Sequence, residues 1–168
     1  MAFFSMNPIL QSLITSLQSA VPDAVLDQHE FRDETTLTIQ RERIVDVCAY
    51  LRDNSICAFP ICEDVSGVDQ YQRKNRFEVV YHFFSIAQRE RIALKVKVDL
   101  DDCSVPSITS VYPGADWYER EAFDMFGIAF TNHPDLRRVY MPEDYEYYPL
   151  RKDFPLMGIP GSIPLPKR

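Results

Sequence analysis

The last part of the chain is rich in proline, and this limits its structure more than any other feature does. Seven of the 12 prolines lie between residues 134 and 166. Because proline fixes φ and lacks a backbone donor, such a segment forms neither a helix nor an interior strand. The segment also holds more large apolar side chains than a disordered linker would. These side chains are Leu136, Val139, Tyr140, Met141, Tyr145, Tyr147, Tyr148, Leu150, Phe154 and Leu156. We therefore predict an extended but ordered arm over residues 133–168.

The apolar side chains of this arm must cover a surface, and two are available. A core of about 133 residues has a radius of gyration of ~14 Å, whereas about 35 extended residues reach about 110 Å. We therefore expect the arm to wrap a partner protein, with Leu150, Phe154 and Leu156 as anchors. Arg151 and Lys152 are expected to pair with partner carboxylates. The alternative is that the arm covers a sheet face of its own domain.

Residues 1–132 predict a core domain of the α+β class, with a mixed, mainly antiparallel sheet and flanking helices. Apolar residues at helical spacing predict three helices, which begin near residues 8, 41 and 115. Gly127 follows the third helix, where a left-handed capping residue is wanted. Strand-like composition predicts a hairpin over 24–40, a strand over 56–64 and a second hairpin that joins 77–87 to 92–100.

Two details of this expected sheet depend on local patterns. The segment 77–87 is apolar at both parities, which predicts a central strand covered on both faces. The segment 65–75 is polar, which predicts a loop. The segment 92–100 alternates between apolar and polar residues, which predicts one buried and one exposed face.

Charge and hydropathy exclude several classes of protein. The chain has 18 Lys and Arg against 25 Asp and Glu, so its net charge of −7 argues against nucleic-acid binding. No apolar run approaches the ~18 residues that a membrane span needs. The first eight residues lack the basic region of a secretory signal. We expect a soluble cytoplasmic protein that can still dock on a membrane complex.

The four cysteines, Cys48, Cys57, Cys62 and Cys103, match neither zinc-ribbon nor ferredoxin spacing. Cys48 lies on the apolar stripe of a predicted helix, and Cys57 and Cys62 lie in a predicted strand. We interpret all four as small buried apolar residues in a reducing compartment. A metal site is the less favoured alternative.

The densest polar cluster lies on the third predicted helix. It comprises Glu119, Arg120, Glu121 and Asp124, and it is followed by His133, Arg137 and Arg138. The carboxylates of Glu121 and Asp124, three residues apart, share a helical face and could serve as an acid–base pair. The nearby arginines favour ion pairs that tie the helix to the arm. The chain also lacks a Walker loop, a dinucleotide-binding loop and a nucleophile elbow. The residues alone therefore favour a noncatalytic assembly protein.

Four consecutive motifs resemble one known family closely. They are WYEREAFDMFGI over Trp117 to Ile128, HPDLRR over His133 to Arg138, PED over Pro142 to Asp144, and PLRKDFPL over Pro149 to Leu156. Together they resemble the C-subunit family of respiratory complex I, the proton-pumping NADH:quinone oxidoreductase. This chain departs from many relatives at Tyr145 to Tyr148, where they have Trp and Gly-His.

The resemblance implies a peripheral-arm subunit on the cytoplasmic side of the inner, or plasma, membrane. It implies no cofactor in this chain, with FMN and iron–sulfur clusters in partner subunits. It also implies that the C-terminal arm wraps the D subunit of the complex, near the small iron–sulfur subunits B and I. The cluster from Glu119 to Arg138 and the arm residues Leu150 to Leu156 would then serve assembly, with no catalytic or metal-binding residue.

Two other functions stay open. Related membrane complexes fed by ferredoxin, F420 or a hydrogenase module contain similar subunits. A stand-alone enzyme that uses Glu119, Glu121 and Asp124 as acid–base groups is less favoured.

Overall fold

A computed structural model describes residues 7–32, 34–71 and 74–159 of the 168-residue chain. The expected arm is therefore described up to residue 159, and its segment 160–168 lies outside the described residues. Most of the N-terminal segment in which a secretory signal was sought, residues 1–6, also lies outside them.

The fold is α+β, as the sequence predicted, and its largest element is a five-stranded mixed sheet. The strand order is β1-β2-β5-β4-β3, and every neighbouring pair is antiparallel except β2 with β5. The strands are β1 Val25–Phe31, β2 Glu34–Ile39, β3 Ile61–Asp69, β4 Phe77–Ser85 and β5 Glu90–Val98. Both expected hairpins, β1–β2 and β4–β5, are confirmed.

The pairing of β4 with β5 places the core on one face of the sheet. Tyr81 pairs with Leu94, and both side chains are fully buried. On the opposite face His82 pairs with Ala93, and 44% of the His82 side chain is exposed. The prediction that β4 is covered on both faces is therefore wrong. The side chains of β4 that point away from the core, such as Val80 and Phe84, are apolar, so the strand looks like a core strand in the sequence. On that face, however, several side chains of β4 are only half-buried.

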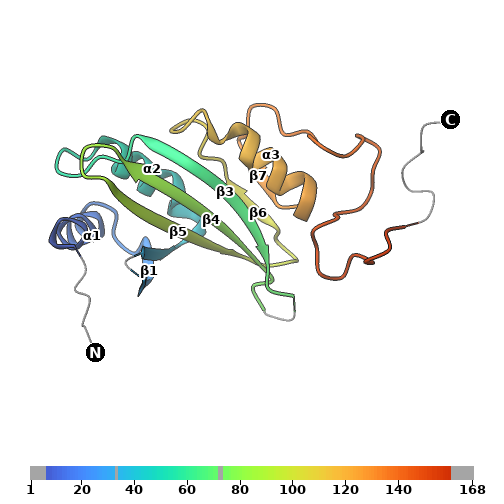
Figure 1. The fold of residues 1–168 in the computed structure, drawn as a ribbon, viewed down its shortest axis with the longest axis horizontal. Helices are drawn as coiled ribbons and strands as arrows, with labels where there is room; N and C mark the ends of the chain where they lie inside the picture. The colour runs from blue at the N-terminus through green and yellow to red at the C-terminus, as the bar shows by residue number, and fades with distance from the viewer. Residues whose placement is uncertain (1–6, 33, 72–73, 160–168) are drawn as a thin grey trace.

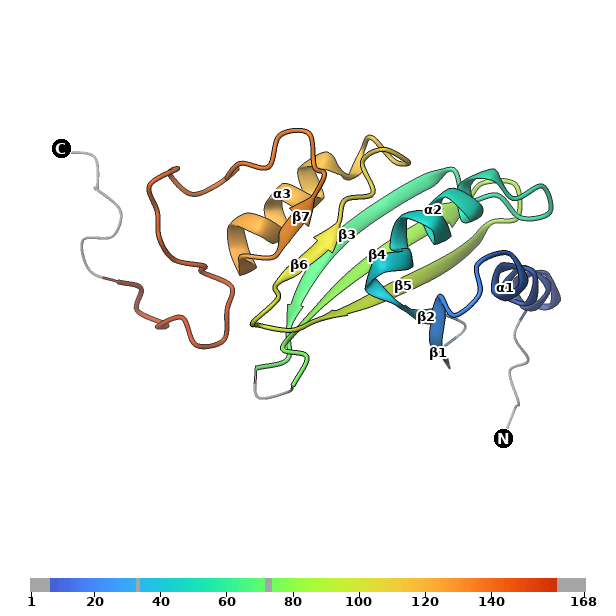
Figure 2. The same ribbon diagram turned by 180° about the vertical axis from the view of Figure 1, so that it is seen from behind.

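Two helices supply much of the core that covers this sheet. Helix α1, Pro8–Ala20, begins as predicted, with the Asn7 side chain accepting the Ile9 backbone N–H. Helix α2, Ile44–Asp53, follows a short 3-10 turn over Arg41–Arg43. Each helix buries a stripe at spacing 0, 3, 4 and 7, such as Ile44, Val47, Cys48 and Leu51. Figure 2 shows α2 lying across the sheet.

Strand β3 differs from its prediction at both ends. It begins after Pro60, because proline cannot donate to a strand ladder. It continues to Asp69 through the segment expected to be a polar loop. Cys57 therefore lies before the strand and Cys62 within it. Cys48 and Cys57 are buried as expected, whereas Cys62 and Cys103 are half-buried, and all four are free thiols.

The third helix lies alongside β3 and leads into the arm (Figure 1). Helix α3 spans Ala115–Phe126, and Gly127 closes it in the left-handed conformation with φ of 76°, both as predicted. A short parallel pair brackets this helix in the sequence: β6, Ser104–Pro106, precedes α3 and pairs with β7, Ala129–Thr131, which follows it. Both views show the described part of the arm looping past α3, at the end of the molecule opposite α1.

Candidate partner-binding site

The last turns of α3 carry a buried carboxylate that binds the arm. Asp124 has no exposed surface. Its Oδ1 atom accepts from the guanidinium of Arg138 at 2.6 Å, and its Oδ2 atom accepts the backbone N–H groups of Val139, Tyr140 and Met141 at 2.7–3.0 Å. Burial alone would raise the pKa of Asp124, but these hydrogen bonds outweigh it and lower the pKa below its ordinary value. The expected ion pair between helix and arm therefore forms here.

Arg120 is the second arm-binding residue of α3, and it binds carbonyl groups. Its guanidinium donates to the backbone carbonyls of Arg137 and Arg138 at 3.2 and 3.5 Å. It also lies 4.7 Å from the ring of Trp117, which is 63% exposed. By contrast, the side chain of Arg137 is exposed and pairs with the exposed Asp135. The sequence analysis made no distinction between Arg137 and Arg138. In the structure the side chain of Arg137 is exposed, whereas that of Arg138 is buried against Asp124.

Glu119 is buried, and its hydrogen bonds hold the loop before α3 rather than the arm. It accepts from the Ser107 hydroxyl at 2.6 Å and from the Ile108 backbone N–H at 2.8 Å, so it holds the loop before α3. Desolvation raises its pKa to about 7 in spite of these hydrogen bonds. The imidazole of His133 is also fully buried, with Nε2 3.9 Å from Glu119 and 3.8 Å from Asp116.

A second set of contacts fixes the far end of the described arm. Asp69, at the end of β3, accepts from Arg76 through both oxygens and from the backbone N–H of Lys152 at 2.8 Å. Arg76 also pairs with Asp153 at 2.9 Å. Burial raises the pKa of Asp69, but the hydrogen bonds prevail and lower it to about 2. Sequence reasoning missed Asp69, Arg76 and Asp153, because no local pattern marks a pairing across so long a stretch of chain.

Between these two sets, the arm packs directly on the end of α3. Arg151 donates to the Phe126 carbonyl at 2.6 Å, and its guanidinium lies 4.3 Å from the centre of the Tyr148 ring. A Cβ atom on Gly127 would lie 2.6 Å from atoms of both Arg151 and Tyr148. Arg151 was expected to pair with a partner carboxylate, but here it binds its own core. Parts of the arm thus contact their own domain, at α3 and at the end of β3 rather than across a sheet face as the alternative interpretation expected.

Several large apolar side chains of the arm are exposed. Leu156 and Met157 are almost completely exposed, and Tyr140 and Leu150 are more than half exposed. Phe154 is half-buried, and Lys152 is exposed, with its backbone N–H bonded to the core. An apolar patch of this kind marks a protein interface in soluble proteins. The partner-binding role of these residues stays a prediction.

The expected carboxylates do not form an acid–base pair. Both oxygens of Asp124 are occupied, Glu119 is enclosed, and Glu121 is exposed on the outside of α3. Across the described ranges, no group of three or more His, Cys, Asp or Glu residues is placed to hold a metal ion. None of the helices in the same ranges has the length and apolarity to cross a bilayer.

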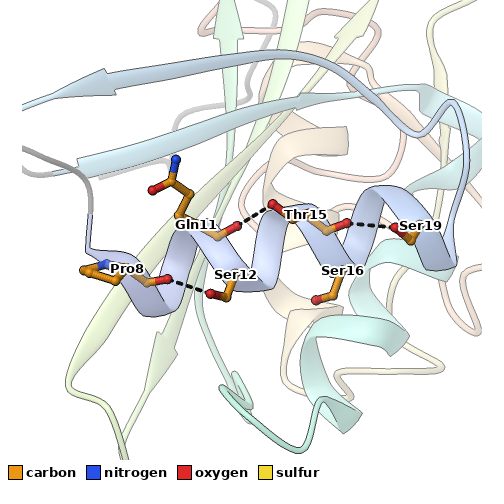
Figure 3. A pocket seen from close by; sticks show the side chains of 6 residues that line it. All are labelled: Pro8, Gln11, Ser12, Thr15, Ser16 and Ser19. Atoms are coloured by element: carbon orange, nitrogen blue, oxygen red, sulfur yellow. Dashed lines mark hydrogen bonds between the residues drawn. The ribbon is translucent and has the colours of Figure 1, made fainter.

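The hollows of the surface are shallow or small. One of about 590 Å³ runs along the outer side of α1 (Figure 3), where the hydroxyls of Ser12, Thr15 and Ser19 bond back to carbonyls of their own helix. A second, of about 390 Å³, lies within the arm beside Tyr147, Tyr148 and Phe154. A third, of about 230 Å³, lies between β3 and α3.

The fold and the arm define a class of protein. Residues 37–160 match the family described as "Respiratory-chain NADH dehydrogenase, 30 Kd subunit". The chain is 52% identical over 145 residues to the C subunit of NADH-quinone oxidoreductase from Roseiflexus sp. (strain RS-1), an alignment that covers 86% of this chain and 83% of that protein. It is 48% identical over 153 residues to the same subunit of Xanthobacter autotrophicus (strain ATCC BAA-1158 / Py2), with 91% and 73% covered.

Solved structures agree with this class. A trypsin-resistant fragment (1–134) of Nqo5 superposes with a TM-score of 0.65 at 25% identity, covering 76% of this chain and 99% of the fragment. A chain of the membrane-bound sulfane sulfur reductase, an archaeal respiratory membrane complex, shares the fold with a TM-score of 0.72 at 24% identity, covering 88% and 86%. The chain therefore belongs to the 30 kDa subunit family of respiratory-chain NADH dehydrogenase. Its curated relatives in that family are named as the C subunit of NADH-quinone oxidoreductase.

Proposed function

We propose that this chain is a noncatalytic structural subunit in the peripheral arm of a proton-translocating NADH:quinone oxidoreductase. Such a complex transfers electrons from NADH through FMN and iron–sulfur clusters to quinone. The observation that carries the proposal is the two-sided arm. Its inner side is bonded to Asp124 and Asp69, whereas its outer side presents Leu150, Leu156 and Met157 to solvent.

An arm that is bonded to its own core and exposes apolar side chains suits a subunit that binds other subunits. Docking an already ordered segment loses less conformational entropy than docking a free one. Fully burying each exposed leucine or methionine contributes about 1.5–3 kcal/mol. A few such side chains are enough to keep a subunit in a complex after the cost of association.

The absence of a catalytic role in this chain is part of the proposal. General acid–base catalysis needs a titratable group within reach of a bound substrate. Glu119 and Asp124 are used in packing α3 against its surroundings, and Glu121 is exposed at the small pocket between β3 and α3. We propose that FMN and the iron–sulfur clusters belong to partner subunits.

The proposed partners follow from the family. The arm would contact the D subunit of the complex, and the core would lie near the small iron–sulfur subunits B and I. This chain would then be peripheral, on the cytoplasmic side of the inner membrane. Nucleic acid is not expected as a partner, because the net charge is −7.

An affinity purification from gently solubilised membranes tests this function. A tagged chain should bring down the D, B and I subunits together with NADH:quinone reductase activity. The chain purified alone should contain no stoichiometric flavin or iron and show no turnover. Recovery of the chain with a ferredoxin-linked or hydrogenase-linked complex would show that the electron donor of the complex is not NADH. Recovery of the chain alone, with its own flavin or metal, would contradict the proposal.

A further inference from the structure

A pocket of about 230 Å³ lies between β3 and α3. Its walls come from Asp64 to Gly67 of β3, from Glu121, Ala122 and Phe126 of α3, and from Leu150 of the arm. The pocket therefore forms where three parts of the chain meet. It opens beside the apolar outer side of the arm, since Leu150 is 53% exposed.

The wall of this pocket beside β3 and α3 is held by close packing. Gly67 faces the ring of Phe126, and a Cβ atom at residue 67 would lie 2.5 Å from Cδ2 of that ring. The ring therefore lies directly on the backbone of β3, which any other residue would prevent. Together with Ala122 and Leu150 it gives the pocket an apolar lining.

The polar groups of the pocket are acidic. Glu121 is exposed, and among the described residues its carboxylate has no hydrogen bond or ion pair. The Asp64 carboxylate accepts from the neighbouring Ser66 hydroxyl, and Nδ1 of His82 lies 3.8 Å from it. No lysine or arginine lines the pocket. The Asp64 side chain lies on the sheet face of its strand partner His82, so it is the Glu121 carboxylate that stands at the opening without a cation to balance it.

The size of the pocket decides what it can hold. Small-molecule and cofactor sites usually measure about 300–1,000 Å³, so this pocket is too small for a cofactor. A pocket below this range suits a single side chain better than a whole small molecule. Lysine and arginine lay their aliphatic stems along apolar surface and keep the charged head in a polar place. The lining offers both environments.

We propose that this pocket is a socket for one arginine or lysine side chain of a partner protein in the complex. The stem would lie on Phe126, Ala122 and Leu150, and the charged head would bind Glu121. Arginine is enriched at protein interfaces and binds carboxylates through two parallel hydrogen bonds. The inference rests on the proposed function, because it names the chemistry of the partner that the arm side of this chain meets.

The test measures how firmly a tagged chain stays on its membrane complex as salt is raised. Glu121→Lys places a cation against the partner's cation, and Glu121→Gln removes the charge with little change of shape. Asp46→Asn is the control, because Asp46 is an exposed helical carboxylate of α2 that pairs with Arg43 alone. We expect Glu121→Lys to lower the retained fraction about tenfold or more, Glu121→Gln to lower it less, and Asp46→Asn to leave it unchanged.

Thermal unfolding of each purified variant separates docking from folding. Glu121 has no partner in the described core, so both variants should melt as the wild type does. If Glu121→Lys has a lower Tm than the wild type, its loss from the complex could come from unfolding. The fraction of Glu121→Gln retained on the complex then tests the proposal. Retention of Glu121→Gln and Glu121→Lys at the wild-type level would overturn the socket while the proposed function stands. A wild-type chain that captures no other subunit would overturn both.

Discussion

The carboxylate of Asp124 and the guanidinium of Arg138 meet at 2.6 Å with both side chains withdrawn from solvent. The exposed fractions of the two side chains are 0% and 9%. This ion pair lies beside the three backbone N–H groups that the same carboxylate binds. It therefore fixes the start of the arm to the end of α3.

Removing one member of this pair should destabilise the chain strongly. Arg138→Ala leaves a buried carboxylate without its cation, and we expect a loss of about 3–5 kcal/mol in the free energy of unfolding. Arg137→Ala is the matched control, because Arg137 is exposed, and we expect a change within about 0.5 kcal/mol. Urea unfolding followed by circular dichroism measures both. Equal effects would contradict the assigned environments.

The arm should also resist any side chain at Gly127. This residue has φ of 76°, and a Cβ atom would meet Tyr148 and Arg151 at 2.6 Å. We expect Gly127→Ala to cost more than about 1 kcal/mol of stability, because backbone strain and the clash add. Gly114→Ala is the control, since Gly114 has φ of −66° and open space around it. Thermal melting should show a lower Tm for the first variant only.

Acid should release the far end of the arm. The pKa of Asp69 is lowered from 3.8 to about 2 in the fold, so its contribution is complete above pH 4 and is lost as the pH falls towards 2. The shift corresponds to about 2 kcal/mol. Asp69→Asn should flatten the stability curve between pH 4 and pH 2, as measured by urea unfolding. An unchanged slope in this variant would show that other carboxylates cause the acid loss.

Glu119 should produce the opposite slope at higher pH. Its pKa is raised from 4.5 to about 7, so the folded state keeps its proton where the unfolded chain has lost it. Stability from this group is complete below pH 4.5 and falls as the pH rises to 7, by about 3 kcal/mol. Glu119→Gln should remove this slope, because an amide does not titrate. Parallel curves for the two proteins between pH 4.5 and pH 7 would contradict the assignment.

How much the sequence could predict depended on how local each signal was. Helix α3 and its capping residue Gly127 follow from a continuous pattern and a single glycine, and both are confirmed. The bond from Lys152 to Asp69 joins residues 83 positions apart, which no local pattern predicts. The polar cluster of α3 was found in the sequence, but the burial of Glu119, Arg120 and Asp124 was not predicted. Hydrogen bonds offset their desolvation, and periodicity does not reveal such partners.

The most direct test of the account asks whether the exposed side of the arm binds another subunit. Leu156 is fully exposed, so Leu156→Asp should leave the Tm of the purified chain unchanged. The control is Leu26→Asp, an equally drastic change at an exposed residue of β1, which lies away from the arm (Figure 1). The measurement is the fraction of each tagged variant recovered in the solubilised membrane complex. We predict a large loss for Leu156→Asp and normal recovery for Leu26→Asp, whereas normal recovery of Leu156→Asp would contradict the central claim.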